Sequence, residues 1–178
     1  MNTSHHEVGQ PLEFSLPNVG KGPAHYETAD LTSASGVALV VLLRNHYCPL
    51  SRRKVRRLGD RIGEFEAADV PVVAVLPDTT ERADVWEQRY GLPFPFLADP
   101  SDDEPEDEDR APSQFGAFES VQNRIPRTPG VIVVETDGGS PTIGSVHSGE
   151  NPQDCPSVDE MIDIAHHGRT DQKEKPTI

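Results

Sequence analysis

The sequence has 178 residues, 34% of them hydrophobic, which corresponds to one globular domain rather than to a disordered or multidomain chain. Its 16 basic and 30 acidic side chains give a formal net charge of −14, and a surface so negative repels phosphate backbones and anionic lipid headgroups. Nucleic acids and membranes are therefore poor partners. The longest uninterrupted apolar run, residues 37–43, is about a third of the roughly 20 residues that cross a bilayer, so we expect no transmembrane helix.

Residues 1–10 are polar and include His5, His6 and Glu7, whereas a secretory signal has a basic and then an apolar segment. We therefore expect a flexible N-terminal tail and a cytoplasmic protein. Thiols are kept reduced in that compartment, so Cys48 and Cys155 are expected to be reactive or inert thiols rather than a permanent structural disulfide.

The charged residues comprise 12 Arg and 4 Lys against 15 Asp and 15 Glu. This acid-rich, lysine-poor balance resembles that of proteins from halophiles, whose dense carboxylates hold water in molar salt. The alternative is an ordinary acidic cytosolic protein.

Alternating apolar residues over 12–16 predict a short half-buried strand, which a turn at Pro17 and Asn18 ends. Residues 37–43 are aliphatic throughout and predict a central strand that is buried on both faces. After Ser51 the apolar residues are spaced by three and four, which predicts an amphipathic helix with Ser51 as its N-cap. These apolar residues are Val55, Leu58, Ile62 and Phe65.

Residues 70–76 predict a second apolar strand, and Asp78 with Glu81 resembles a capping arrangement that opens the next helix. Gly91 is expected to close that helix, and residues 94–97 to form a short strand.

Residues 99–110 hold eight acids and two prolines, which predicts a solvated loop. The acids are not at alternate positions and the turn glycine is missing, so this is not a calcium loop. Residues 130–135 and 142–147 predict an antiparallel hairpin, and Ser157 is expected to cap the last helix before a polar tail at 168–178. This order of elements predicts an α/β domain with a mixed central sheet and helices on both faces.

Cys48 lies a few residues after the central strand and just before a helix, where backbone N–H groups stabilise an anion such as a thiolate. Five of the 16 basic residues lie in the stretch 52–57, so the remaining 11 face 30 acids and the rest of the chain carries −19. Exposed cations in a first helical turn cost roughly 0.3 to 1 kcal/mol each, so helix stability does not explain them. Either a nearby anion or salt bridges with the acidic surface would explain these cations.

Residues 43–51, Leu-Arg-Asn-His-Tyr-Cys-Pro-Leu-Ser, resemble the active-site loop of thioredoxin-like proteins in the peroxiredoxin-like branch, the alkyl hydroperoxide reductase and thiol-specific antioxidant relatives. Residues 14–18 resemble the opening strand of that family, and residues 90–100 resemble its middle segment. The resemblance covers about residues 8–165 and implies a thioredoxin-like fold for the predicted domain, residues 11–167.

The resemblance implies that Cys48 is the peroxidatic cysteine and that Arg127, with Arg124 in reserve, supports its thiolate. It also places Pro129, before a strand, where the fold usually has a proline facing the cysteine. Typical members have a proline seven residues before the cysteine and Thr or Ser three before it; here these positions are Val41 and Asn45.

Compared with the Cys-x-x-Cys pattern, Ser51 replaces the second cysteine, so no local disulfide can form. In a thioredoxin-like fold the loop that carries Cys155 reaches the Cys48 end, so Cys155 is either a resolving cysteine or incidental; bridging requires Cα atoms within about 7 Å. His46 is a candidate to take the thiol proton or, protonated, to stabilise the thiolate, and Tyr47 is a candidate hydrogen-bond donor. The alternative for His46 is a plain surface residue.

The leading hypothesis is a thiol-dependent peroxidase that takes a peroxide or a small thiol or disulfide, with an external thiol or a thioredoxin-like protein as reductant. A monothiol exchange protein and a non-catalytic binding module are the alternatives, and the sequence leaves a homodimer open. No cofactor is expected. No metal is expected either, because His166 and His167 are adjacent on a helix and face different directions.

The net charge of −14 generates a first prediction. Screening relieves self-repulsion, so the midpoint of thermal unfolding should rise between low salt and about 1 M KCl, where the Debye length is about 3 Å. Circular dichroism melts across a KCl series measure it. A midpoint that stays constant or falls would refute the halophile interpretation.

Overall fold

The computed structural model describes residues 11–32, 35–44, 48–99, 130–136, 141–148 and 156–174, the last range with side chains only as far as residue 166. Its elements in chain order are β1 (Ser15–Pro17), β2 (His25–Glu27), the 3-10 helix η1 (Thr28–Asp30), β3 (Val37–Leu42), α2 (Pro49–Asp60), α3 (Ile62–Ala67), β4 (Val72–Leu76), α4 (Thr80–Tyr90), β5 (Phe96–Ala98), β6 (Gly130–Glu135), β7 (Thr142–Ser148) and α6 (Val158–Glu174). None of the helices in these ranges is long and apolar enough to cross a bilayer.

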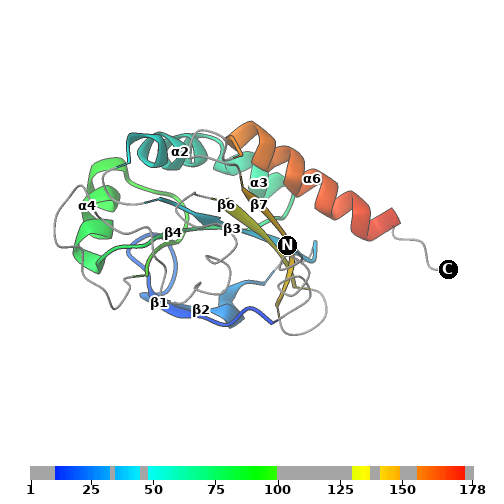
Figure 1. Cartoon of the computed structure of the whole chain (residues 1–178), viewed down its shortest axis with the longest axis horizontal. Coiled ribbons are helices and arrows are strands. Elements are labelled where there is room, and N and C mark those ends of the chain that lie inside the picture. Colours follow the sequence, from blue (N-terminus) through cyan, green and yellow to red (C-terminus); the bar gives the residue numbers. More distant parts are fainter. Residues whose placement is uncertain are drawn as a thin grey trace.

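Five strands form one mixed sheet in the order β5-β4-β3-β6-β7 (Figure 1). Strands β3, β4 and β5 run parallel, whereas β6 is antiparallel to β3 and β7 is antiparallel to β6. The predicted central strand and the predicted hairpin are therefore confirmed. Every residue of β3 is buried, as a continuous aliphatic run in the middle of a sheet requires.

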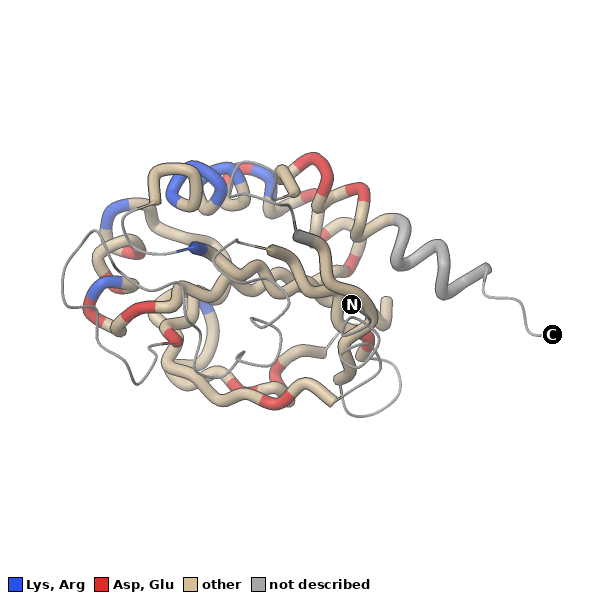
Figure 2. The backbone as a smooth tube through the Cα atoms, viewed as in Figure 1, with Lys and Arg blue, Asp and Glu red and all other residues tan. Residues whose placement is uncertain are grey.

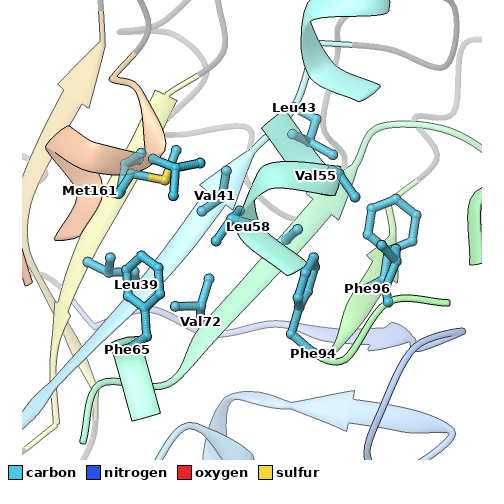
Figure 3. Packing of buried hydrophobic residues seen from close by; sticks show 14 of the residues in the cluster. Leu39, Val41, Leu43, Val55, Leu58, Phe65, Val72, Phe94, Phe96 and Met161 are labelled. Carbon is cyan, nitrogen blue, oxygen red and sulfur yellow. The ribbon is translucent and has the colours of Figure 1, made fainter. Parts of the chain in front are cut away.

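The pleat of β3 divides the core into two layers. Leu39 and Val41 face the helices and pack with Val55 and Leu58 of α2 and Phe65 of α3 (Figure 3). The alternate residues of β3 face the other side, where the N-terminal segment and the β1–β2 hairpin cover them. Within the described ranges α2, α3, α4 and α6 lie on the first side and η1 is the helix on the second. The α/β fold predicted from the sequence is confirmed.

The predicted starts of two helices are wrong. Helix α2 begins at Pro49 with Cys48 as its N-cap, two residues before the predicted cap at Ser51. Proline favours this first position because its ring presets φ and the first N–H has no helical partner to lose. Helix α4 is capped by Thr79, whose hydroxyl accepts from the backbone N–H of Arg82 at 3.3 Å, and not by Asp78.

The predicted long helix after Ser51 is also divided. The backbone at Arg61 leaves the helical region, with φ −111° and ψ 12°, and α3 then carries Phe65 into the core. Helix α6 continues to Glu174, past the predicted end at residue 167.

Two predicted helix ends are confirmed. Gly91 closes α4 in the left-handed conformation, with φ 59°. Ser157 caps α6: its hydroxyl accepts from the N–H of Glu160, and its own N–H donates to the Glu160 carboxylate. Hydrogen bonds from the backbone N–H and then the side chain of Ser157 to the Glu160 carboxyl hold the pKa of Glu160 below its usual range.

Asn18 ties the N-terminal segment to β5. Its amide nitrogen donates to the carbonyls of Lys21 at 2.9 Å and Pro23 at 2.8 Å. Its amide oxygen accepts from the backbone N–H groups of Gly20 and Phe96, both at 2.9 Å. A residue that the sequence predicts only as the end of a strand therefore satisfies a backbone group 78 residues away in the chain.

Replacing Asn18 should destabilise the fold in graded steps. Asn18→Ala strands the buried N–H of Phe96 and should cost roughly 2 to 3 kcal/mol of unfolding free energy, since an unsatisfied buried group costs about 1 to 3 kcal/mol. Asn18→Asp keeps both accepting bonds but sets a carboxylate oxygen against the carbonyls of Lys21 and Pro23, so at pH 7 its cost should be the larger of the two. Urea unfolding of the three proteins measures this, and equal losses in both variants would contradict it.

Candidate active site around Cys48

The three parallel strands end at one edge of the sheet, where α/β proteins usually place reactive groups. Cys48 follows β3, Asp78 follows β4, and Asp99 follows β5. Both aspartates are buried, and Asp78 pairs with Arg82 at 3.3 Å. The sequence predicts a solvated loop that begins at Asp99. This prediction is wrong for Asp99 itself, which is only 2% exposed.

Cys48 is a free thiol at the first turn of α2 and is only 4% exposed. Its backbone is extended, with φ −78° and ψ 113°, and its carbonyl accepts the first helical bond from Arg52 at 3.2 Å. Pro49 has no N–H, so the N–H groups of Leu50 and Ser51 are those at the positive end of the helix with no intrahelical acceptor. The thiol therefore lies where the helix favours a negative charge.

Ser51 fastens the loop that carries Cys48. Its side chain is 2% exposed, and its hydroxyl oxygen accepts from the backbone N–H of Arg44 at 3.1 Å. One residue earlier, Leu43 donates to the carbonyl of Val75 at 3.0 Å and so continues the sheet. This side-chain bond joins the end of the β3 segment to the first turn of α2.

Val41, which replaces a proline of typical relatives, lies inside β3. It pairs with Ala74 of β4 on one side and Val131 of β6 on the other. A proline would remove an N–H from this ladder, so valine suits a central strand that is paired on both sides.

The basic residues of α2 follow one another along its backbone (Figure 2), and three of the five contact neighbouring segments. The guanidinium carbons of Arg52 and Arg56 lie 5.5 Å and 5.6 Å from the ring centroids of Trp86 and Tyr90 on α4. Lys54 donates to the carbonyl of Pro156 at 2.5 Å. These contacts join α2 to α4 and to the segment just before α6, which neither of the two sequence-based explanations anticipated.

A signal for these cation–π contacts exists in the sequence. The two arginines are four residues apart, as are the two aromatic residues, so each pair lies on one helix face. Arg53, Arg56 and Arg57 form no ion pair within the described ranges. Within those ranges, salt bridges with the acidic surface therefore do not account for these three arginines.

His147 is a residue that the sequence analysis did not consider. It lies opposite Val131 in the β6–β7 pair, and Val131 belongs to the helix-side core, so the two side chains share that face. Burial lowers the pKa of His147, which keeps its imidazole neutral at pH 7. Because His147 pairs with the start of β6, its neutral imidazole lies at the end of the sheet where β3 ends and the chain continues toward Cys48.

The other predicted site residues, His46, Tyr47, Arg127, Pro129 and Cys155, lie outside the described residues, as do Asn45 and Arg124. The structure therefore brings together Cys48 and Ser51 and does not test the rest. Among the side chains that it describes, no group of three or more His, Cys, Asp or Glu is arranged to hold a metal ion.

A mixed sheet with a buried thiol at the start of the helix after the central strand defines a thioredoxin-like thiol protein. Residues 8–138 match the model of the AhpC/TSA family, and the chain belongs to that family. No curated protein sequence matches the chain.

Solved structures of peroxiredoxins share the fold over nearly the whole chain. Enterococcus faecalis AhpC superposes with a TM-score of 0.69 at 13% identity, covering 97% of this chain and 98% of its own. A yeast mitochondrial 1-Cys peroxiredoxin gives 0.68 at 12% identity, with 94% and 78% covered. The reduced Plasmodium vivax 2-Cys peroxiredoxin gives 0.66 at 11% identity, with 94% and 84% covered. The predicted peroxiredoxin-like, thioredoxin-like fold is confirmed.

The Arg44–Ser51 bond predicts that Ser51→Ala makes Cys48 more accessible. Losing the bond should cost about 1 kcal/mol, and such a shift in a local opening equilibrium speeds alkylation of Cys48 about fivefold. Iodoacetamide labelling followed by mass spectrometry measures the rate.

Ser157→Ala is the matched control, because it removes a capping hydroxyl from α6. It should lower stability by a similar amount and leave the alkylation rate of Cys48 unchanged. If both variants speed alkylation equally, Ser51 contributes only to general stability.

Proposed function

We propose that this protein is a thiol-dependent peroxidase in which Cys48 attacks the peroxide. The observation that carries the proposal is the position of Cys48: a free, buried thiol that caps α2 behind the central strand, in a chain of the AhpC/TSA family. The positive end of α2 favours the thiolate, which is the nucleophilic form of cysteine.

The first step oxidises Cys48 by two electrons. The Sγ thiolate attacks one peroxide oxygen and forms an S–O bond, the O–O bond breaks, and the leaving oxygen takes a proton to become water or an alcohol. Cys48 becomes a sulfenic acid. With 4% of the residue exposed, a narrow substrate such as hydrogen peroxide or a small hydroperoxide suits the site better than a bulky one.

The second step needs another thiol, which attacks the sulfenic sulfur, forms a disulfide and releases water. Cys155 is the proposed resolving cysteine, because Pro156, its neighbour in the chain, accepts a hydrogen bond from Lys54 of the helix that Cys48 begins. Lys54 is six residues after Cys48, about 9 Å along the helix axis. This supports an approach of Cys155 toward Cys48, which would have to bring their Cα atoms within about 7 Å.

The remaining roles are proposed on the family resemblance. Arg127 stabilises the thiolate, His46 exchanges the thiol proton, Tyr47 donates a hydrogen bond and Pro129 faces the cysteine. An external thiol then reduces the disulfide. The yeast relative resolves its thiol through glutathione and thioredoxin systems, which supports a small thiol or a thioredoxin-like protein for this role.

The peroxidase proposal predicts selective oxidation of Cys48. Half an equivalent of hydrogen peroxide, in the presence of a 1,3-dione that traps sulfenic acid, should label Cys48 and not Cys155. Peptide mass spectrometry measures the label, and Cys48→Ser should abolish it. If Cys48 stays unlabelled but exchanges with a small disulfide, the protein is a monothiol exchanger. If neither reaction occurs, it is a binding module.

Cys155→Ser separates the two steps. Without the trap, the oxidised wild type should show a Cys48–Cys155 disulfide on non-reducing peptide maps, and the variant should accumulate the sulfenic acid instead. A wild type that never shows this disulfide has a one-cysteine mechanism with an outside reductant.

A further inference from the structure

A hollow of about 360 Å³ lies between the last turns of α2 and α4, away from the thiol site. Its lining includes Arg56 and Asp60 of α2 and Arg89 and Tyr90 of α4. Arg56 is eight residues after Cys48, about 12 Å along the helix axis. The volume is at the lower end of the range of about 300 to 1,000 Å³ for small-molecule sites.

The two arginines of the hollow have no acidic partner in the described part of the chain. Arg56 is held over the ring of Tyr90 at 5.6 Å, which fixes its guanidinium in place before any ligand binds. Arg89, in the last turn of α4, is exposed. A protein with a net charge of −14 thus has two arginines in the lining of one concave site.

Two glycines shape the walls. Gly59 lets α2 approach the chain beyond α4, because a Cβ there would lie 3.2 Å from Cδ of Pro93. Gly91 turns the chain in a left-handed conformation and adds no side chain to the hollow. The space in front of the arginines therefore stays open.

Asp60 lines the same hollow and forms an ion pair with neither arginine. The Asp60 carboxylate would repel a simple anion. A ligand with an anionic group at one end and a hydroxyl group at the other can bind both the arginines and the carboxylate. Each guanidinium offers a fork of N–H donors that matches two oxygens. Two such forks suit the several oxygens of a phosphate better than a single carboxylate.

We propose that this hollow binds a small phosphate monoester that carries hydroxyl groups, such as a sugar phosphate. The phosphate binds Arg56 and Arg89, and a hydroxyl group donates to the carboxylate of Asp60. The site is separate from Cys48, so its occupancy does not depend on the peroxidase chemistry.

The test uses ribose 5-phosphate, inorganic phosphate and ribose as probes of the wild-type chain. The single tryptophan, Trp86, reports binding by fluorescence because its ring centroid lies 6.4 Å from that of Tyr90 in the hollow wall. Calorimetry gives the affinities. Ribose 5-phosphate should bind more tightly than phosphate, and ribose should not bind.

The variants separate a built site from general charge. Arg56→Gln and Arg89→Gln should each weaken ribose 5-phosphate binding about tenfold or more, the loss expected for a charged hydrogen-bonded contact. Arg57→Gln, an exposed position on the same helix outside the hollow, makes the same charge change and should alter binding less than about twofold. Asp60→Asn should strengthen phosphate binding and reduce the advantage of the sugar phosphate.

Three outcomes would overturn the proposal. One is no binding of ribose 5-phosphate at millimolar concentrations, and another is an equal loss in the Arg57 and Arg56 variants. The third is binding that appears only when the seven acids in residues 102–109 are changed to Asn and Gln, because the chain's own carboxylates would then be the occupant.

Discussion

The burial of β3 on both faces is the constraint on which the rest of the structure depends. A strand in the middle of a sheet can bury both sides only if each has its own cover, so the helices take one side and the N-terminal hairpin takes the other. Its pairing with β4 and β6 fixes the point at which the chain leaves the sheet. Cys48 is placed by that exit, because only a short connection separates the strand from α2.

Helix α2 is held at several points by contacts of different kinds. Its first turn is fastened to the strand end by the Ser51 hydroxyl, and its middle rests on the aromatic rings of α4 through two arginines. Arg61, just past its end, pairs with Asp159 of α6 at 2.6 Å. Cation–π contacts become stronger when they are desolvated and need no acidic partner, so they hold α2 against α4 without a carboxylate at these two arginines.

The fold could be predicted from the sequence wherever a local sequence pattern determines the structure. The candidate site could be predicted only in part. The aliphatic run of β3, the glycine at the end of α4 and the Ser157 cap each carry a local signal. The bonds of Asn18 to Phe96 and of Lys54 to Pro156 join residues 78 and 102 apart, and no periodicity encodes such pairs. Ser51 was misassigned because a serine before an apolar stripe suits both a cap and an inward-facing bond.

The burial of Cys48 imposes different demands on the two halves of the proposed reaction. A small peroxide needs little room, but a disulfide requires its two sulfur atoms to come within about 2.05 Å, so a second thiol must reach a residue that is only 4% exposed. Among the described residues, the bond between Arg44 and Ser51 is a contact that resists this entry. The Arg44–Ser51 bond that holds the first turn of α2 during the reaction with peroxide therefore also opposes the opening that the resolving thiol requires. A hydrogen bond with a net contribution of about 1 kcal/mol is weak enough to allow both steps.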